Sequence, residues 1–236
     1  MSNETDANGR IGPQLSLADV SIPPAVGEAF GALYGTAAPA TGAEWVTAMG
    51  ETVERVEGRR PTVADLCTAP DGEHVFVPDD AEDDGTGERA YRCPLDPLVY
   101  PFLTGTAGTV RSPVPGGESV VTVEIGTDGV ELSHDEAVVS LGVARGLDDA
   151  EPTLATVYRD VCGYVRAFPD RAAYERWAAD VDAATMALPV REGVALAREL
   201  AAALFADGEA TRDETAGATE YDDCGPECGC AEGGAD

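Results

Sequence analysis

The chain has 236 residues and is strongly acidic, with 44 Asp and Glu against 15 basic residues, all of them Arg, for a formal net charge of −29. Duplex nucleic acids and anionic membrane surfaces are bound through clustered cations, so this charge argues against both partners. A hydrophobic content of 44% nevertheless predicts a packed core rather than a disordered acidic chain.

Acidity spread along the chain without any Lys resembles proteins from cells that keep molar salt in the cytoplasm. At about 1 M salt the Debye length is near 3 Å, which screens the self-repulsion of such a chain. We therefore expect a halophilic, archaeal source. The first residues show no signal peptide and no apolar run reaches the roughly 20 residues of a membrane span. We expect a cytoplasmic protein whose six Cys are reduced thiols.

The N-terminal part of the sequence predicts short helices after a disordered segment at residues 1–20. A helix begins near Pro24, and a second covers residues 43–56. A third short helix is capped by Thr62 and ends near Cys67, which we assign to the core. Residues 21–72 thus form a small winged-helix-like region, expected to act as a lid or support.

The remaining sequence predicts an antiparallel or mixed β-sheet core with flanking helices, which makes the fold class α+β. Turn residues separate the apolar segments. The predicted strands cover residues 74–77, 89–92, 109–111, 119–125, 129–132 and 137–143. A strand or strand-helix junction follows at residues 160–168, and helices are expected at residues 171–180 and 190–205. Residues 207–236 form an acidic tail without apolar periodicity, expected to be disordered.

Cys93 and Asp96 are three residues apart, where a predicted strand ends and a turn or short helix begins. A thiol near a helix N-terminus, with Arg92 beside it, is expected to ionise easily and to bind soft metals. A purely structural alternative is that Asp96 caps a helix whose first residue is Pro97, and that Cys93 is a small buried apolar residue.

Residues 92–107, RCPLDPLVYPFLTGTA, resemble the catalytic segment of the organomercurial (alkylmercury) lyases, and residues 157–168, VYRDVCGYVRAF, resemble the second cysteine segment of that family. A helix with Trp177 follows, as in the family. The resemblance covers roughly residues 74–204 and implies a catalytic domain over residues 73–206.

The resemblance implies that Cys93 and Cys162 are the catalytic thiolates and that Asp96 is the carboxylate that handles the proton. Two sulfurs bind the soft mercury of R–Hg⁺, and a proton delivered to carbon releases R–H and leaves Hg²⁺ on the thiolates. No organic cofactor or resident metal is implied. The expected partners are organomercurial small molecules and an Hg²⁺ acceptor such as mercuric reductase or a small thiol.

The sequence departs from the family in three places. Gly163 follows Cys162 where the family often has adjacent cysteines, and a structural cysteine is replaced around Val114. The N-terminal helical region matches the family only in general character.

Three further cysteines, Cys224, Cys228 and Cys230, lie close together in the tail and could bind a soft metal, either to hand over mercury or to hold another ion such as zinc. An incidental thiol cluster is the alternative. For the whole chain, the main alternative is a non-catalytic protein that sequesters Hg²⁺ or Cu⁺ through Cys93, Cys162 and the tail. A thiol redox protein is disfavoured because no thioredoxin-like C-x-x-C motif is present. His74, His134 and both Trp residues are predicted to be structural.

Overall fold

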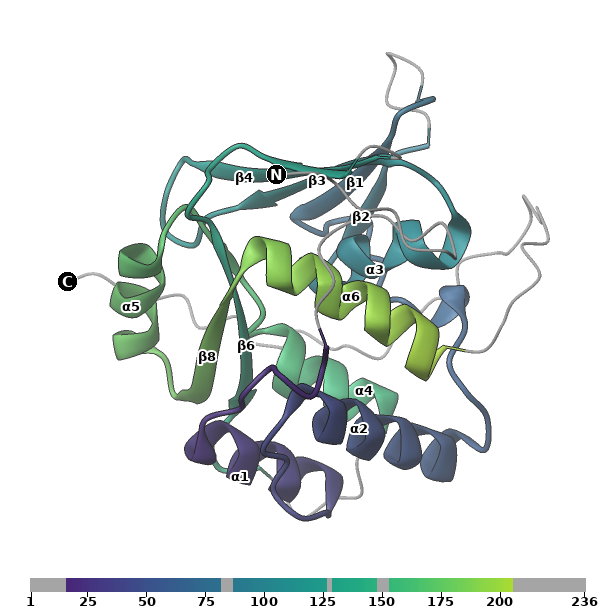
Figure 1. Cartoon of the computed structure of the whole chain (residues 1–236), viewed down its shortest axis with the longest axis vertical. Coiled ribbons are helices and arrows are strands. Elements are labelled where there is room, and N and C mark those ends of the chain that lie inside the picture. Colours follow the sequence, from purple (N-terminus) through teal and green to yellow (C-terminus); the bar gives the residue numbers. More distant parts are fainter. Residues whose placement is uncertain (1–15, 82–86, 127–128, 148–152, 206–236) are drawn as a thin grey trace.

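The computed structural model describes residues 16–81, 87–126, 129–147 and 153–205 (Figure 1). Of the predicted disordered N-terminus only residues 16–20 lie within this part of the chain, and the predicted disordered tail at residues 207–236 lies wholly outside it. The described residues form an α+β fold with two antiparallel sheets. None of their helices is long and apolar enough to cross a membrane.

The N-terminal part contains helices α1 (Pro24–Tyr34) and α2 (Gly42–Glu57), as the sequence predicts. Thr41 caps α2 by accepting a hydrogen bond from the Glu44 amide. The third expected helix is wrong in its extent: only the 3-10 turn η1 (Val63–Asp65) forms, because Thr62 and Asp65 close a capping box around a single turn. Leu66 and Cys67, which follow this turn directly, are not helical.

The larger sheet has five strands in the order β2-β1-β3-β4-β5, all antiparallel. Its strands are β1 (His74–Pro78), β2 (Arg89–Tyr91), β3 (Gly108–Pro113), β4 (Val120–Gly126) and β5 (Gly129–Leu132). Burial alternates along β3 and β4, so one face of this sheet is packed and the other is more exposed. Helix α3 (Leu95–Thr104) packs against β1, β2 and β3.

The smaller sheet has the order β7-β6-β8 and is also antiparallel. It consists of β6 (Val138–Ala144), β7 (Ala167–Phe168) and β8 (Ala183–Pro189). Nearly every residue of β6 is buried, which is typical of a strand covered on both faces. Helix α5 (Arg171–Asp180) packs on β6 and β8, where Phe168, Tyr174 and Trp177 form an aromatic cluster separate from the main core.

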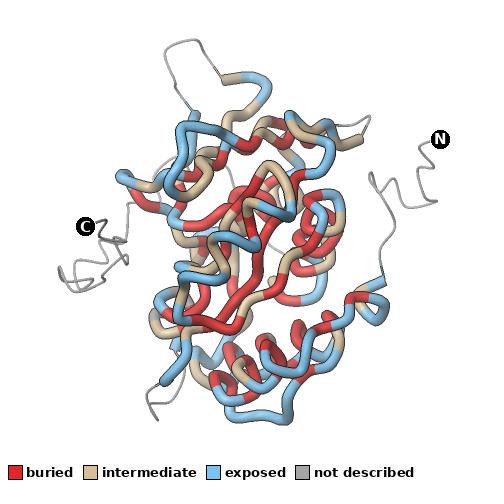
Figure 2. The backbone as a smooth tube through the Cα atoms, turned by 90° about the vertical axis from the view of Figure 1, so that its left-hand side faces the viewer, coloured by how far each residue is buried: buried red, intermediate tan, exposed pale blue. Residues whose placement is uncertain are grey.

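The two sheets and the N-terminal helices share one hydrophobic core (Figure 2). Helix α6 (Val190–Leu204) occupies its middle and contacts α2, α3, β6 and β8. Helix α4 (Leu154–Val157) leads into the π-helical turn η2 (Tyr158–Cys162), which packs on β6. The segment that links β6 to β7 therefore brings the second cysteine segment into the same core.

Most predicted strands and helices are confirmed to within two residues, but β8 and α4 were not predicted from the sequence. Strand β8 combines small Ala residues with Thr185 and Met186 and lacks the β-branched run that usually marks a strand. Its strand conformation follows from seven-residue pairing with β6. Helix α3 is also longer than the turn or short helix expected, and it ends at Gly105, whose φ of 70° closes the helix in the left-handed region.

Candidate active site

The first half of the site lies where β2 ends and α3 begins. Cys93 follows β2, is only 1% exposed, and precedes the helix by two residues. The positive end of the α3 dipole therefore lies beside this thiol. Because α3 begins at Leu95, Asp96 lies inside its first turn, and the structural alternative in which Asp96 is the N-cap is wrong.

The carboxylate of Asp96 is held by backbone from outside its own helix. Its Oδ2 atom accepts a hydrogen bond of 2.8 Å from the amide of Cys67. Burial raises the pKa of Asp96 to about 6, and the hydrogen bond from Cys67 opposes this shift. A carboxyl with this pKa can take up and give away a proton near neutral pH, which is what a proton carrier needs.

Cys67 belongs to this half of the site, so its assignment to the core is wrong. It is half-buried rather than enclosed, and its carbonyl accepts a hydrogen bond of 3.2 Å from the amide of Arg92, next to Cys93. The loop after it approaches β2 closely because Gly72 has no side chain: a Cβ there would lie 2.5 Å from the Tyr91 carbonyl oxygen. No sequence pattern predicts that the Cys67 loop packs against β2, because the two segments lie on either side of β1 in the chain.

The second half of the site is the π-helical turn η2, which ends at Cys162. Ser140 on β6 holds the chain just after this turn, since its hydroxyl donates to the Tyr164 carbonyl at 2.8 Å and accepts from the Arg166 amide at 2.9 Å. Ser140 is fully buried, so these bonds are shielded from water. No sequence pattern distinguishes Ser140, which lies among the apolar residues of a predicted strand.

The structure brings the two halves together, with Cys93 as the hydrogen-bond partner of the Cys162 thiol. The pKa of Cys162 is raised well above its usual value, mainly by this hydrogen bond and then by burial. Electrostatic repulsion from the nearby Cys93, Asp96 and Cys67 groups raises it further. In the resting protein Cys162 is thus a thiol that still carries its proton. We call Cys67, Cys93, Asp96 and Cys162 the thiol cluster; none of its cysteines forms a disulfide.

Arg166 bridges the two halves beside the thiol cluster. Its guanidinium lies 3.4 Å from Nε2 of His74 on β1 and 3.5 Å from the Arg92 carbonyl, both at the long end for hydrogen bonds. His74 is 1% exposed, and burial together with the Arg166 charge lowers its pKa to about 3. A neutral, buried His74 agrees with the structural role predicted for it.

Helices α1 and α2 supply an aromatic wall near Cys162. Tyr34, at the end of α1, is close enough for Cys162 to influence its hydroxyl, whose pKa is raised mainly by burial. Trp45 on α2 lies beside that hydroxyl, and its ring packs against that of Phe30 with 5.3 Å between the ring centroids. Among the described residues, neither the Tyr34 hydroxyl nor the Trp45 indole nitrogen has a hydrogen-bond partner of good geometry. The N-terminal helices therefore bound the site as well as supporting the core.

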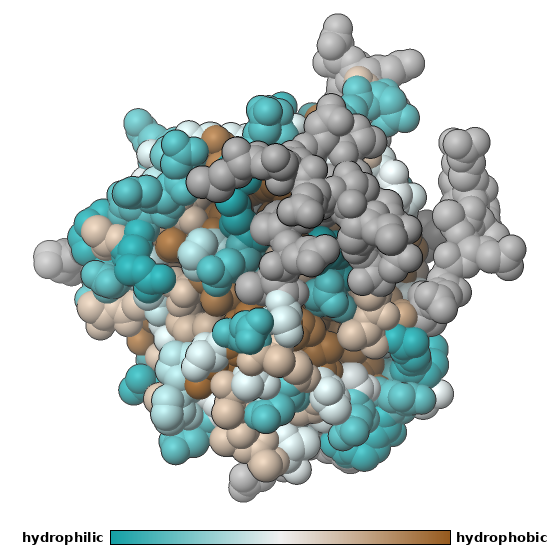
Figure 3. Space-filling model, viewed as in Figure 1, coloured by the Kyte–Doolittle hydropathy of each residue, from teal (hydrophilic) through white to brown (hydrophobic). Residues whose placement is uncertain are grey.

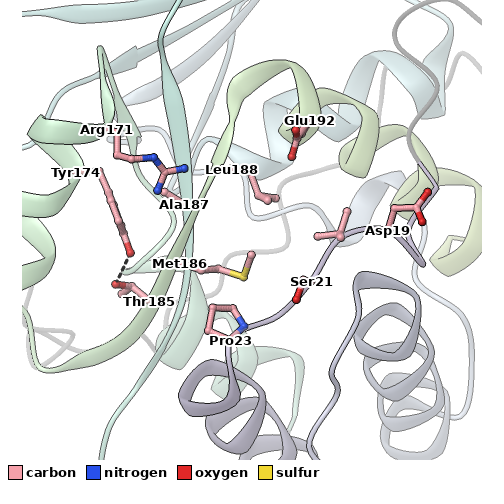
Figure 4. Close-up of a pocket in the computed structure, with 11 residues that line it drawn as sticks. Asp19, Ser21, Pro23, Arg171, Tyr174, Thr185, Met186, Ala187, Leu188 and Glu192 are labelled. Atoms are coloured by element: carbon pink, nitrogen blue, oxygen red, sulfur yellow. Dashed lines mark hydrogen bonds between the residues drawn. The ribbon is translucent and has the colours of Figure 1, made fainter.

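A separate hollow of about 400 Å³ lies between the N-terminal segment, α5, β8 and α6 (Figure 4). Asp19, Arg171 and Glu192 stand at its edges, and Met186 and Leu188 form part of its floor. No member of the thiol cluster lines it. Hydrophilic residues dominate the edges of the face drawn in Figure 3, and hydrophobic ones gather nearer its middle.

The arrangement can bind a soft ion through two thiols and deliver a proton from a carboxyl beside them. Within the described ranges, no three His, Cys, Asp or Glu side chains are already arranged to hold a metal ion together. The proposed tail site at Cys224, Cys228 and Cys230 lies outside the described residues.

The three comparisons with known proteins bear on this arrangement. A search of curated proteins gave no match. Among solved structures, the chain is similar to one described as the mercury-bound form of MerB2, at 10% identity and a TM-score of 0.39. That alignment covers 56% of this chain and 59% of the other, so the chain spans less than two thirds of that protein. The family model for alkylmercury lyase, MerB, matches residues 69–202, which include Cys93, Asp96 and Cys162. With more than half of its length matched, the chain belongs to the alkylmercury lyase family.

Proposed function

We propose that this protein is an organomercurial lyase that cleaves the carbon–mercury bond of R–Hg⁺ by protonolysis. The observation that carries the proposal is the meeting of Cys162 with Cys93 and Asp96, which lie on a segment far from it in the sequence. Family membership and this meeting of two thiols with one carboxyl support the same chemistry.

In the proposed reaction, one thiolate of the Cys93 and Cys162 pair binds the mercury of R–Hg⁺ and the second sulfur then joins it. The proton of that second thiol passes to Asp96, which delivers it to the carbon as the carbon–mercury bond breaks. R–H leaves, and Hg²⁺ remains on two thiolates, so protons and charges balance. Mercury is substrate and product, and the thiols and carboxyl supply the chemistry without a resident metal or organic cofactor.

The raised pKa values of Asp96 and Cys162 suit these roles. A carboxyl with a pKa of about 6 exchanges a proton readily near neutral pH. A thiol that holds its proton in the resting protein becomes a far stronger acid once mercury binds its sulfur, because the metal stabilises the thiolate. Substrate binding would thus trigger the proton transfer that cleavage needs.

The test is single-turnover cleavage of phenylmercury in molar KCl with excess small thiol, followed by benzene release. Cys93→Ser, Cys162→Ser and Asp96→Asn are each expected to lower the rate by at least about 10²-fold, the usual scale for losing a nucleophile or a proton carrier. Asp96→Asn should still bind mercury. Glu124→Gln, on β4 and remote from the thiol cluster, is a carboxyl control that should cleave normally.

Absence of benzene from the folded, unmodified protein would contradict the lyase proposal. If that protein still bound Hg²⁺ at the cysteine pair, the alternative of a non-catalytic soft-metal binding protein would replace it. The proposed acceptor is mercuric reductase or a small thiol, and the proposed location is the cytoplasm of a halophile, where a charge of −29 would be screened by salt.

A further inference from the structure

The feature that the proposed reaction does not use is Cys67. Its backbone touches both ends of the Cys93 segment, through the 2.8 Å bond to Asp96 and the 3.2 Å bond from the Arg92 amide. It lies two residues before the segment that matches the family model. The third cysteine of the cluster therefore lies outside the part of the chain that the family model matches.

The three thiols differ in their access to water. Cys93 is 1% exposed, whereas Cys67 and Cys162 are both half-buried. Mercury left on Cys93 and Cys162 is difficult for an external thiol to reach, since exchange needs direct attack at the metal. A half-buried thiol beside the pair offers the metal a more exposed position. Cys67 and Cys162 are also near enough for one to influence the ionisation of the other.

We propose that Cys67 is a third mercury-binding thiol, which replaces Cys93 on the bound Hg²⁺ and so moves the metal to the exposed side of the cluster. The proposal rests on the proposed function for the origin of the mercury. In this step a bond forms between Cys67 Sγ and mercury, the bond from Cys93 Sγ to mercury breaks, and the Cys67 proton passes to Cys93. Mercury stays divalent and two-coordinate before and after the exchange.

This exchange needs only two thiols on the metal in each stable state. It is therefore compatible with the finding that no three potential ligands are prearranged around one point in the part of the chain that the structure describes. The Cys67 backbone is already fixed beside Asp96 and Arg92, which keeps this thiol at the cluster.

The decisive experiment uses HgCl₂ rather than an organomercurial, so it does not depend on lyase activity. It is done in the full chain with Cys224, Cys228 and Cys230 replaced by Ser, to remove the tail thiols. In this background, Cys93→Ser should still bind one Hg²⁺ through Cys67 and Cys162, with ultraviolet absorption of a dithiolate complex. Adding Cys67→Ser should weaken binding by at least about 10²-fold, because only one thiol remains.

A matched control moves the thiol by one residue. Thr68 is exposed and neighbours Cys67, so Thr68→Cys added to the Cys93→Ser, Cys67→Ser chain keeps the number of thiols but places the new one at an exposed position. This chain should not regain dithiolate binding. Equal Hg²⁺ affinity with and without Cys67 in the Cys93→Ser background would overturn the proposal.

A second measurement leaves all three cluster cysteines in place, in case Cys93→Ser does not fold. Alkylation of Cys67 by iodoacetamide is followed by mass spectrometry before and after one equivalent of HgCl₂. Protection of Cys67 by at least about 3-fold supports the exchange, since a thiol that shares the metal is blocked for part of the time. An unchanged alkylation rate would show that Cys67 does not bind mercury, whatever the protein does to phenylmercury.

Discussion

The two halves of the thiol cluster are built in different ways. The Cys93 half is a regular junction of a strand with a helix in the five-stranded sheet, and its carboxylate is held by the amide of Cys67. The Cys162 half is a π-helical turn on the three-stranded sheet, and Ser140 holds the residues that follow it. Neither sheet contains the whole site, so the geometry of the two thiols depends on how the sheets pack together.

The largest expected effect concerns the junction between the halves and depends on pH. The folded pKa of His74 is lowered to about 3 from 6.5, so neutral His74 stabilises the protein above pH 6.5, and this contribution is lost as pH falls towards 3. By linkage the loss is on the order of 5 kcal/mol. Denaturant unfolding at several pH values should show it, and His74→Gln should have a shallower pH dependence over this range. An equal pH dependence of the free energy of unfolding in the two proteins would mean that His74 does not make the packing of the two halves sensitive to pH.

The next largest effect breaks the Cys93 half alone. Gly72→Ala places a Cβ against the backbone of Tyr91, where the nearest atom is 2.5 Å away, so the loop that carries Cys67 must move. We expect a loss of about 3 kcal/mol in the free energy of unfolding and slower benzene release, because Asp96 loses its anchoring amide. Gly117→Ala, at a turn where a Cβ meets nothing closer than 3.9 Å, is the control and should cleave normally. Normal cleavage by Gly72→Ala would show that the anchor is dispensable.

A smaller effect breaks the Cys162 half. Ser140→Ala removes the hydroxyl that bonds the Tyr164 carbonyl and the Arg166 amide, and we expect a loss of about 2 kcal/mol because these groups are left without that partner. The same substitution should weaken the binding of Hg²⁺, because the position of Cys162 is less firmly fixed. Ser140→Thr keeps the hydroxyl and tests whether the bonds, rather than the volume, matter. If Ser140→Ala bound Hg²⁺ as tightly as the unmodified protein, Ser140 would not position Cys162.

The smallest effect separates stability from function at Asp96. Its folded pKa is raised from 3.8 to about 6, so its contribution to stability is present below pH 3.8 and is lost as pH rises through 6. Asp96→Asn removes the free-energy cost of burying an ionised carboxylate and keeps an oxygen that can accept from the Cys67 amide. After allowance for the partial exposure of this residue, we expect a gain of roughly 1–2 kcal/mol at pH 7 and none at pH 3.5. A loss of stability at pH 7 would contradict the account of this carboxyl.

The cysteine segments and most of the elements around them could be predicted from the sequence, because local patterns specify them. Apolar spacing and Thr41 mark α2, and the Asp170 cap marks α5. Cys93, Asp96 and Cys162 were found through two motifs whose order and spacing resemble one family. Strand β8 was missed because it is held in place by β6 rather than by its own β propensity.

The sequence by itself determined the acidic net charge, the α+β class and the three residues expected to carry the chemistry. Only the tertiary structure decided that Cys67 lies beside Asp96, that Ser140 fixes the exit of the Cys162 turn, and that Arg166 spans both halves. The physical reason is that each of these contacts joins segments distant in the chain. Their energies depend on the packing of two sheets around a shared core, and local sequence patterns do not encode that packing.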